Sequence, residues 1–422
     1  MNSINKIREN IQHCKEKLLL KNDNSNLDEI MELDKEVRSL KTVSGEIRAE
    51  RNSASEMIAE TKKSGADTTR AVMETRKLGE DLKVIEKKLK VKMQSLKEYL
   101  YKLPNFPHNS VPQGKDEKEN VVVRTWGDMP NLNFKPKTHI ELGNDLRLFD
   151  FERAAKISGS GFSLYTGKGA QIERALINLM IDHHTSEFNF EEIFPPVLMR
   201  KESMITTGQL PKFEEDMYHT ELDNLYLAPT AEVPITNIHR DEIISGEKLP
   251  IYYVSYTPCF RRESGSYGKD TRGLLRMHQF NKVELVKFTK PCDSYIELES
   301  LTEQAESLLQ KLGLRYRVVE LCTGDLSFAA AKCYDLEVWA PGENKWLEVS
   351  SCSNFESFQA RRGNIRFRDT STNKVEFLHT LNGSGVATPR LLVALLETYQ
   401  TDKGTIKFPD QIAKLLDIKE IV

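Results

Sequence analysis

The stretch from Tyr256 to Phe288 brings together residue types that could bind an anionic substrate. It reads YTPCFRRESGSYGKDTRGLLRMHQFNKVELVKF, a pattern that predicts two β-strands joined by a loop containing glycines. Alternate residues of a strand share one face, and those on one face of the second strand would be Arg276, His278, Phe280, Lys282 and Glu284. The opposite face is mostly apolar. The hairpin would therefore cover a core on one side and line a polar cleft on the other.

Further charged residues lie on the first strand and in the loop. Arg261 and Glu263 would share a face, so a guanidinium and a carboxylate could point into the same cleft. The loop from Ser264 to Gly273 suits a flexible, cationic cover over an anionic ligand. The residues that indicate such a cover are Gly265, Gly268, Lys269 and Arg272. The alternative is an amphipathic hairpin whose polar face is simply solvated.

The order of these residues resembles a known signature. The string FRRE at 260–263, a glycine-bearing loop, and Arg276 and Phe280 in R-x-x-x-F spacing are similar to motif 2 of class II aminoacyl-tRNA synthetases. The longer string is similar to that of the bacterial seryl-tRNA synthetase family. The resemblance implies an α+β fold, in which an antiparallel sheet flanked by helices is preceded by an antiparallel α-helical coiled-coil arm.

Two other segments resemble the substrate-binding motifs of this family. The triplet TAE at 230–232 matches the serine loop, in which small polar groups and a carboxylate contact the ammonium and hydroxyl groups of serine. The segment TLNGSGVATPR at 380–390 resembles motif 3. Thr388 suits an N-cap and Pro389 a first helical turn, which would place Arg390 at a helix N-terminus that favours anions.

Two further segments complete the resemblance. A helix from about Ala170 to Glu187, followed by a strand at 188–196 that ends in prolines, resembles motif 1, which in the family lies at the dimer interface. Residues 334–339 and 345–351 predict two strands. In the second of these, Glu348 and Ser351 lie where the family holds Mg²⁺ against the ATP phosphates, and both offer the hard oxygen ligands that Mg²⁺ prefers. The two residues differ in strand parity, so both can reach one ion only if the strand has a bulge or ends there.

The resemblance implies a role for each of these positions. Arg261 would hold the α-phosphate and the serine carboxylate, Glu263 would bind the adenine edge, and Phe280 would stack on adenine. The residues implied for catalysis are Arg261, Glu284 and Arg390. Those implied for serine binding are Thr230, Ala231, Glu232, Arg261, Glu284 and Ser384. Those implied for ATP binding are Arg261, Arg262, Glu263, Arg276, Phe280, Glu348, Val349, Ser350, Ser351 and Arg390, of which Glu348 and Ser351 would also bind the metal.

Two long helical patterns precede this region. Residues 27–61 and 68–103 carry apolar residues at the steps of three and four that are typical of a coiled-coil seam, with a turn at 62–67. The seam positions that we expect are Leu33, Val37, Leu40, Ile47, Ala54, Ile58, Val72, Gly79, Leu82, Leu89, Met93, Leu96 and Leu100. The first helix is acidic and the second basic, so part of the charge should pair between them. The remaining basic surface is either a solvated face or, as the resemblance implies, a tRNA-binding surface.

Length and composition are consistent with this division. The chain of 422 residues should form more than one domain: an N-terminal tRNA-binding domain at 1–105 with its arm at about 27–103, a linker at 106–120 and a class II catalytic domain at 121–422. A net charge of −3 means that any nucleic-acid surface must be local. Six scattered cysteines without a C-x-x-C motif suggest free, mostly buried thiols in a reducing compartment. With neither a membrane-length apolar run nor a signal core, a cytoplasmic location is expected.

The function that we expect is the ATP-dependent attachment of L-serine to serine tRNA through a seryl-adenylate, by a homodimer that uses Mg²⁺. The resemblance also implies serylation of selenocysteine tRNA where one exists. Two alternatives remain. A synthetase paralogue that aminoacylates a carrier protein would have no reason for a basic arm, and a non-catalytic coiled-coil scaffold would have no reason to retain Arg261, Glu263, Glu284, Glu348 and Arg390.

Overall fold

The computed structural model describes residues 1–264 and 272–422 and divides the chain into two compact units. The smaller unit comprises residues 2–19 and 23–103, and the larger comprises residues 1, 20–22 and 104–422. The loop residues Gly265, Gly268 and Lys269 lie outside the described residues. Among the described residues, no helix is both long and apolar enough to cross a membrane.

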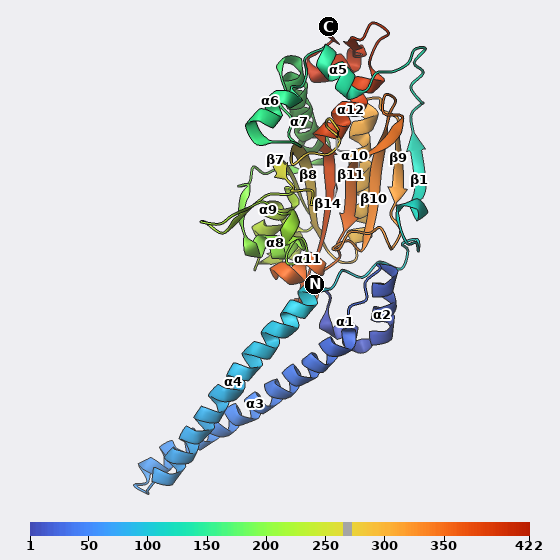
Figure 1. Ribbon diagram of the computed structural model, residues 1–422. Helices are drawn as coiled ribbons and strands as arrows, with labels where there is room; N and C mark the ends of the chain where they lie inside the picture. The colour runs from blue at the N-terminus through green and yellow to red at the C-terminus, as the bar shows by residue number, and fades with distance from the viewer. Residues whose placement is uncertain (265–271) are drawn as a thin grey trace. The chain divides into compact units, whose positions relative to one another are not determined.

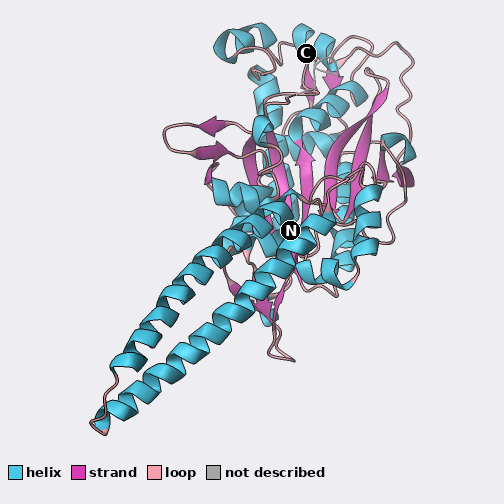
Figure 2. Ribbon diagram, turned by 60° about the horizontal axis from the view of Figure 1, so that its bottom comes forward, coloured by secondary structure: helices cyan, strands magenta, loops and turns pink. Residues whose placement is uncertain are grey.

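The smaller unit is helical. Its helices are α1 (Ile4–Glu9), α2 (Ile11–Leu20), α3 (Leu27–Lys63) and α4 (Thr69–Lys102). Helix α3 begins where the Asn26 side chain accepts a hydrogen bond from the Asp28 backbone N–H at 3.1 Å. Acidic residues follow in its first turn and lysines lie in its last, which complements the helix dipole at both ends. Helices α3 and α4 pair side by side as the antiparallel hairpin that the sequence predicts (Figures 1 and 2).

The seam of this hairpin differs from the prediction at two positions of α4. Leu82, Leu96 and Leu100 are buried as expected, but Val72 and Met93 are 42% and 44% exposed. Polar side chains also occupy the seam: Asp34 and Ser44 are buried on α3. The spacing of apolar residues alone therefore does not predict which positions of α4 are buried.

Charge pairs link the two arm helices, as expected from their opposite charges. Lys92 on α4, next to Met93, is half-buried and lies 2.6 Å from the Glu36 carboxylate on α3. A second pair joins Arg48 to Glu86 at 2.6 Å. These pairs are about half exposed and contribute little stability each, but they fix how the two helices face each other.

The larger unit is built on an eight-stranded sheet with the order β1-β9-β10-β11-β14-β8-β7-β2 (Figure 1). All neighbouring strands in it are antiparallel except β2 and β7, which are parallel. In this order the strands are β1 (Val121–Trp126), β9 (Tyr316–Glu320), β10 (Lys332–Ala340), β11 (Lys345–Asn354), β14 (His379–Ala387), β8 (Gln279–Thr289), β7 (Ile251–Phe260) and β2 (Glu191–Glu192).

Three smaller sheets and a set of helices surround it. The small sheets contain β13 (Val375–Phe377), β12 (Arg366–Arg368) and β6 (Ile243–Ser245); β3 (Leu198–Arg200), β5 (Leu225–Leu227) and β4 (His219–Thr220); and β15 (Ile406–Lys407) with β16 (Glu420–Ile421). The α-helices are α5 (His139–Asp145), α6 (Phe151–Ser158), α7 (Gly167–Phe188), α8 (Lys201–Thr207), α9 (Glu232–Thr236), α10 (Ser294–Lys311), α11 (Phe358–Gly363), α12 (Thr388–Thr398) and α13 (Asp410–Leu416). Short 3₁₀ turns are η1 (Glu117–Glu119), η2 (Glu214–Asp216), η3 (Asn237–His239) and η4 (Gly246–Lys248).

The main core lies between the large sheet and helices α7, α10 and α12. Alternation along β8 places Val283 and Leu285 in this core, whereas Lys282 and Glu284 contact each other on the other face. The antiparallel sheet, its flanking helices and the preceding helical hairpin confirm the predicted α+β fold. All six cysteines are free, and all but Cys292 are buried, as expected.

Two strand predictions need correction. The strand expected at 188–196 is reduced to the two residues of β2. In the hairpin, β7 ends at Phe260 and β8 begins at Gln279, so Arg261, Glu263, Arg276 and His278 lie just beyond the strands. The first strand ends early because the backbone N–H groups of Arg262 and Ser264 bond to the main chain and side chain of Asp216 instead of to β8.

Candidate active site

Two adjoining cavities lie over the hairpin and the neighbouring strands of the large sheet. Their volumes are about 780 and 270 Å³. The residues that line both cavities are Arg261, Glu263, Arg276, Lys282 and Glu348. Because these side chains are shared, the two cavities form one cleft with two ends. The larger end contains Thr230, Glu232 and Ser351, and the smaller end contains Phe280, Val349, Ser384 and Arg390.

Arg261 lies between the two ends. Its Nε donates to the carbonyl oxygen of Pro229 at 3.2 Å, and its guanidinium carbon lies 5.2 Å from the centre of the Phe280 ring. The hydrogen bond and the cation–π contact fix the plane of the guanidinium. A planar fork fixed in this way can bind two oxygens of one anion, or one oxygen from each of two anions.

Glu263 marks the turn at which the first strand ends. Its backbone has φ +51°, a left-handed conformation that is uncommon for residues with a side chain. Its carboxylate pairs with Arg276 Nη1 at 2.8 Å, and both residues line both cavities. The pair therefore joins the two ends of the hairpin loop at the edge of the smaller cavity.

Two buried carboxyl groups lie at or beneath the larger end. Glu284 accepts hydrogen bonds from Asn382 at 2.7 Å and Ser384 at 3.5 Å, and Lys282 Nζ lies 2.5 Å from its second oxygen. Lys282, Asn382 and Ser384 line the cavities, whereas Glu284 itself lies one layer below. The sequence predicted contact between Glu284 and the substrate, but here a lysine covers its carboxylate.

Glu232 is the carboxyl group that lines the larger cavity directly. Its Oε1 accepts a hydrogen bond from Gln359 Nε2 at 2.5 Å, and its backbone N–H bonds to the Thr230 hydroxyl at 3.2 Å. Burial, reinforced by the negative charge of Glu284, raises the pKa of Glu232 to about 7. A cation that enters this pocket would favour the ionised form of Glu232.

Strand β11 contains the bulge that the parity of Glu348 and Ser351 requires. Leu336 on β10 pairs with Ser350, and the next residue of β10 pairs with Glu348, so Val349 is the extra residue. As a result, Glu348 and Ser351 both line the larger cavity. Their donor set, one half-exposed carboxylate and one hydroxyl, fits Mg²⁺, which keeps several waters and takes oxygens from phosphates.

Arg390 is anchored at the smaller end. Its Nε donates to the carbonyl oxygen of Leu275 at 3.2 Å, and its Nη1 donates to that of Glu348 at 2.9 Å. Arg390 lies in the first turn of α12, where the helix dipole also favours anions. Pro389 lies in that first turn, as predicted.

The N-cap of α12 corrects one prediction. The N-cap is Ala387 and not Thr388. The Thr388 hydroxyl instead donates to the buried carboxylate of Glu173 and contacts the carbonyl oxygen of Asn281 at 3.1 Å. A buried carboxylate that needs a donor outweighs the ordinary capping preference of threonine.

Three other predicted residues line neither cavity. Ala231 is fully buried before α9, and Arg262 is exposed. Ser350 is buried, and its hydroxyl donates to the carbonyl oxygen of Ser384 at 2.6 Å. Val349 does reach the smaller cavity, because of the bulge.

The structure also brings to the cleft residues to which the sequence assigned no role there. Lys282 lies on the predicted polar face of the second strand, and strand alternation places Asn382 on the same side as Ser384. The position of both residues in the cleft could therefore be predicted from strand alternation. No local pattern predicts the position of Gln359, because it contacts Glu232 only through the tertiary fold.

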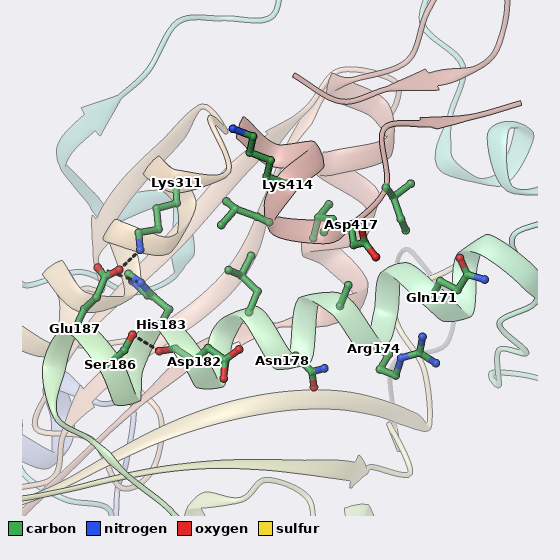
Figure 3. Close-up of a pocket in the computed structure, with 15 residues that line it drawn as sticks. Gln171, Arg174, Asn178, Asp182, His183, Ser186, Glu187, Lys311, Lys414 and Asp417 are labelled. Carbon is green, nitrogen blue, oxygen red and sulfur yellow. Dashed lines mark hydrogen bonds and ion pairs between the residues drawn. The ribbon is translucent and has the colours of Figure 1, made fainter. Parts of the chain in front are cut away.

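A separate cavity of about 560 Å³ lies between α7, α13 and the end of α10 (Figure 3). It shares no lining residue with the cleft. In Figure 3, Lys311 points to Glu187, with which it forms an ion pair, while Asp182 and Arg174 add charges of both signs. This mixed, open surface lies outside the candidate active site.

Comparisons with known proteins agree with this geometry. Residues 1–107 match the family model for the seryl-tRNA synthetase N-terminal domain. Residues 212–399 match the model for the tRNA synthetase class II core domain (G, H, P, S and T). The second match includes the whole hairpin and Arg390.

Similar proteins cover the full length of the chain. The serine–tRNA ligase of Thermodesulfovibrio yellowstonii is 53% identical, covering 98% of each chain. That of Geobacillus kaustophilus is 50% identical, covering 99% of this chain and 98% of its own. Among solved structures, a seryl-tRNA synthetase from Pyrococcus horikoshii complexed with ATP superposes with a TM-score of 0.92 at 38% identity, covering 100% of this chain and 99% of that one.

Proposed function

Given that the chain belongs to the seryl-tRNA synthetase family and joins serine to tRNA with ATP, we propose that serine is activated in the cleft of its larger unit. One observation carries this assignment. Arg261 lines both ends of the cleft, with buried carboxyl groups toward the larger end and an aromatic ring and Arg390 at the smaller end. An amino acid at the larger end and a nucleotide at the smaller end would therefore both contact the guanidinium group of Arg261.

The larger end suits serine. The carboxylates of Glu232 and Glu284 would attract its ammonium group, and Glu284 would become accessible once Lys282 moves aside or bonds to the substrate. The hydroxyl group of Thr230 would bond to the serine side chain from the larger end, and that of Ser384, which lines the smaller end, would reach it where the two ends meet. A substrate without a hydroxyl group would leave these buried polar groups unpaired, which gives stronger discrimination than a missing methyl group does.

The smaller end suits ATP. Phe280 would stack on the adenine, Glu263 would accept a hydrogen bond from the exocyclic amine, and Arg390 would bind the terminal phosphate. Arg276, Glu348 and Val349 would complete the nucleotide site, together with Ser351, which lines the larger end. Mg²⁺ bound by Glu348 and Ser351 would supply positive charge to the phosphates.

In the first half-reaction, an oxygen of the serine carboxylate attacks the α-phosphorus of ATP, and the bond to the β-phosphate oxygen breaks. Arg261 would bind both the attacking carboxylate and the α-phosphate, which aligns the reacting atoms and stabilises the charge that develops on phosphorus. The products are seryl-adenylate and pyrophosphate. In the second half-reaction, a terminal ribose hydroxyl of tRNA takes the seryl group and AMP leaves.

We propose further that residues 1–105 form a domain that binds tRNA through the basic side of the arm. Residues 106–120 would be the linker, and residues 121–422 the catalytic domain that carries out both half-reactions. The match of residues 1–107 to a seryl-tRNA synthetase N-terminal domain favours tRNA over a carrier protein as the acceptor. Selenocysteine tRNA would be accepted through the same surface. Free, mostly buried thiols are consistent with a cytoplasmic location.

A second copy of the chain would cover the predicted motif 1 at residues 170–196. Phe194, an aromatic residue, is 82% exposed there in the single chain. A homodimer would bury such a side chain. A sedimentation mass equal to one chain in the fully active protein would contradict this proposal.

Serine-dependent exchange of pyrophosphate into ATP tests the proposed function directly. Serine should support exchange at least about 100-fold better than alanine or glycine, because both lack the hydroxyl that the pocket binds. Threonine should be poor, because its extra methyl must fit among buried groups. Equal exchange with threonine would exclude serine as the preferred substrate.

The pH dependence of serine binding tests the role of Glu232. Because its pKa is raised to about 7, Glu232 in the empty pocket is mostly protonated below pH 7 and mostly ionised above it. An ammonium group binds the ionised form, so the KM for serine should rise about tenfold between pH 8 and pH 6. Glu232→Gln should weaken serine binding and flatten this profile. The KM for ATP serves as the control and should not follow the same curve.

A further inference from the structure

A buried polar cluster that the proposed function does not use lies where α5 packs beside α12 (Figure 1). His139, the first residue of α5, is fully buried. Its Nδ1 lies 3.1 Å from Glu343 Oε1 and 3.4 Å from Glu397 Oε1. Glu343 belongs to the turn between β10 and β11, and Glu397 is fully buried on α12. The cluster therefore joins three segments that are far apart in the sequence.

Glu397 anchors two of these segments through their backbones. Its Oε1 accepts a hydrogen bond from the His139 N–H at 2.8 Å, and its Oε2 accepts from Gly342 at 2.8 Å and Glu343 at 3.0 Å. A Cβ on Gly342 would lie 2.9 Å from the Glu397 carboxyl carbon, so only glycine permits this approach. With three backbone donors, the buried carboxylate is well satisfied.

The other nitrogen of the imidazole ring contacts the hairpin. The Leu274 backbone N–H donates to His139 Nε2 at 3.2 Å. Because Nε2 accepts this bond, the ring proton lies on Nδ1, facing the two carboxylates. The three side chains are also spaced as metal ligands could be. A metal on Nδ1 would require the ring to lose this proton as well, so the ring is not a ligand. Its Nδ1 lies near the two carboxylates without a hydrogen bond to them, and the hydrogen bond that the ring makes is the one from Leu274 to Nε2.

Leu274 belongs to the segment that leads from the hairpin loop to β8. The preceding residue, Gly273, has φ +64°, and a Cβ on it would lie 2.1 Å from His139 Nε2, so the backbone lies directly on the ring. Leu274 and Leu275 both line the smaller cavity, and the Leu275 carbonyl oxygen accepts the hydrogen bond from Arg390 Nε. The position of the ring therefore fixes the backbone that orients Arg390.

We propose that His139 is a positioning residue for ATP binding, which acts by fixing the Leu274–Leu275 backbone beneath Arg390. This inference rests on the proposed function, because it uses the assignment of the smaller cavity to ATP. His139 contacts neither cavity itself. Its effect should therefore fall on ATP affinity, and serine affinity should be unaffected.

Two amide substitutions of His139 separate this role from a general role in folding. In His139→Asn, the side-chain amide can still face the carboxylates, but the side chain is too short to accept from Leu274. In His139→Gln, the longer side chain can do both. We expect the Asn variant to raise the ATP Kd, measured by calorimetry without serine, by about tenfold, the factor that corresponds to about 1.4 kcal/mol. The Gln variant should stay within about threefold of the wild type.

Gln400→Leu is the matched control. Gln400 is buried, and its amide binds the backbone of Lys137 on both sides, at 2.8 and 3.0 Å, just before α5. It anchors the same segment but does not touch Leu274. Gln400→Leu should lower the melting temperature as much as His139→Asn does, while the ATP Kd stays at the wild-type value.

Gly273→Ala approaches the same contact from the other side. Its Cβ would push the segment off the imidazole ring, so it should raise the ATP Kd, and its effect should not add to that of His139→Asn. An unchanged ATP Kd in folded His139→Asn, an equal rise in the KM for serine, or an equal ATP defect in Gln400→Leu would each overturn the inference. Wild-type protein that binds ATP but shows no serine-dependent exchange would instead overturn the proposed function.

Discussion

Replacing Arg261 with lysine should lower kcat/KM for serine-dependent pyrophosphate exchange by about 10²- to 10³-fold, although the positive charge remains. Lysine cannot keep the bond from Nε to Pro229 or the stacking on Phe280 that fix the plane of the guanidinium. It also offers a single cationic centre where two oxygens must be bound together. Most of the loss should appear in kcat, because the two anions approach each other only as the reaction proceeds.

An exposed arginine provides the control for Arg261→Lys. Arg153 on α6 is in an exposed ion pair with Asp150 and lines neither cavity of the cleft. Arg153→Lys should leave exchange within about twofold of the wild type. If Arg261→Lys retained a comparable rate, the bidentate role of Arg261 would be refuted, since charge alone would then suffice.

Strand alternation and motif order predicted those parts of the cleft that depend on neighbouring residues. Arg261, Glu263 and Arg276 meet because they flank one hairpin, even though the strands themselves end earlier than expected. The mismatch in parity between Glu348 and Ser351 required a bulge or strand end, and Val349 provides the bulge. Local periodicity contains this information because each constraint acts within one or two strands.

Contacts between distant segments could not be predicted in this way. The hydroxyl of Thr388 bonds to Glu173 on α7, and no local pattern reveals that this buried carboxylate needs a donor. Likewise, Gln359 meets Glu232, and His139 meets Leu274, only after the sheet and helices have packed. Local propensity indicates where helices and strands form, but buried polar groups select their partners in three dimensions.

Shortening the arm should separate the two half-reactions. Removing residues 44–86 and joining Val43 to Lys87 through a short glycine turn keeps the buried base of the helical unit, including Leu27, Ile30 and Leu96. Serine-dependent exchange should stay within about twofold of the wild type, because the cleft lies in the larger unit. Aminoacylation of serine tRNA should fall by at least about 100-fold, because phosphate contacts supply much of the affinity for nucleic acid. Full aminoacylation by the shortened protein would show that the outer arm is only a solvated coil.

Charge reversal on one arm helix distinguishes a local tRNA-binding surface from an effect of net charge. Lys87 and Lys90 on α4 are exposed, whereas Lys92 pairs with Glu36. Reversing both exposed lysines to glutamate should weaken tRNA binding about tenfold or more. It should also make the slope of log K against log salt shallower by about 1 to 2, because fewer counterions are released.

The matched control for the α4 variant reverses two exposed lysines of α3, Lys35 and Lys41, and so makes the same change in net charge. If binding depended only on the overall charge of the arm, both double variants would lose the same affinity and the same salt slope. If α4 provides the binding surface, the α3 variant should keep a slope close to that of the wild type, because its lysines contact no phosphates. An unchanged slope in the α4 variant would exclude these two lysines from the tRNA interface, whatever the shortened arm does.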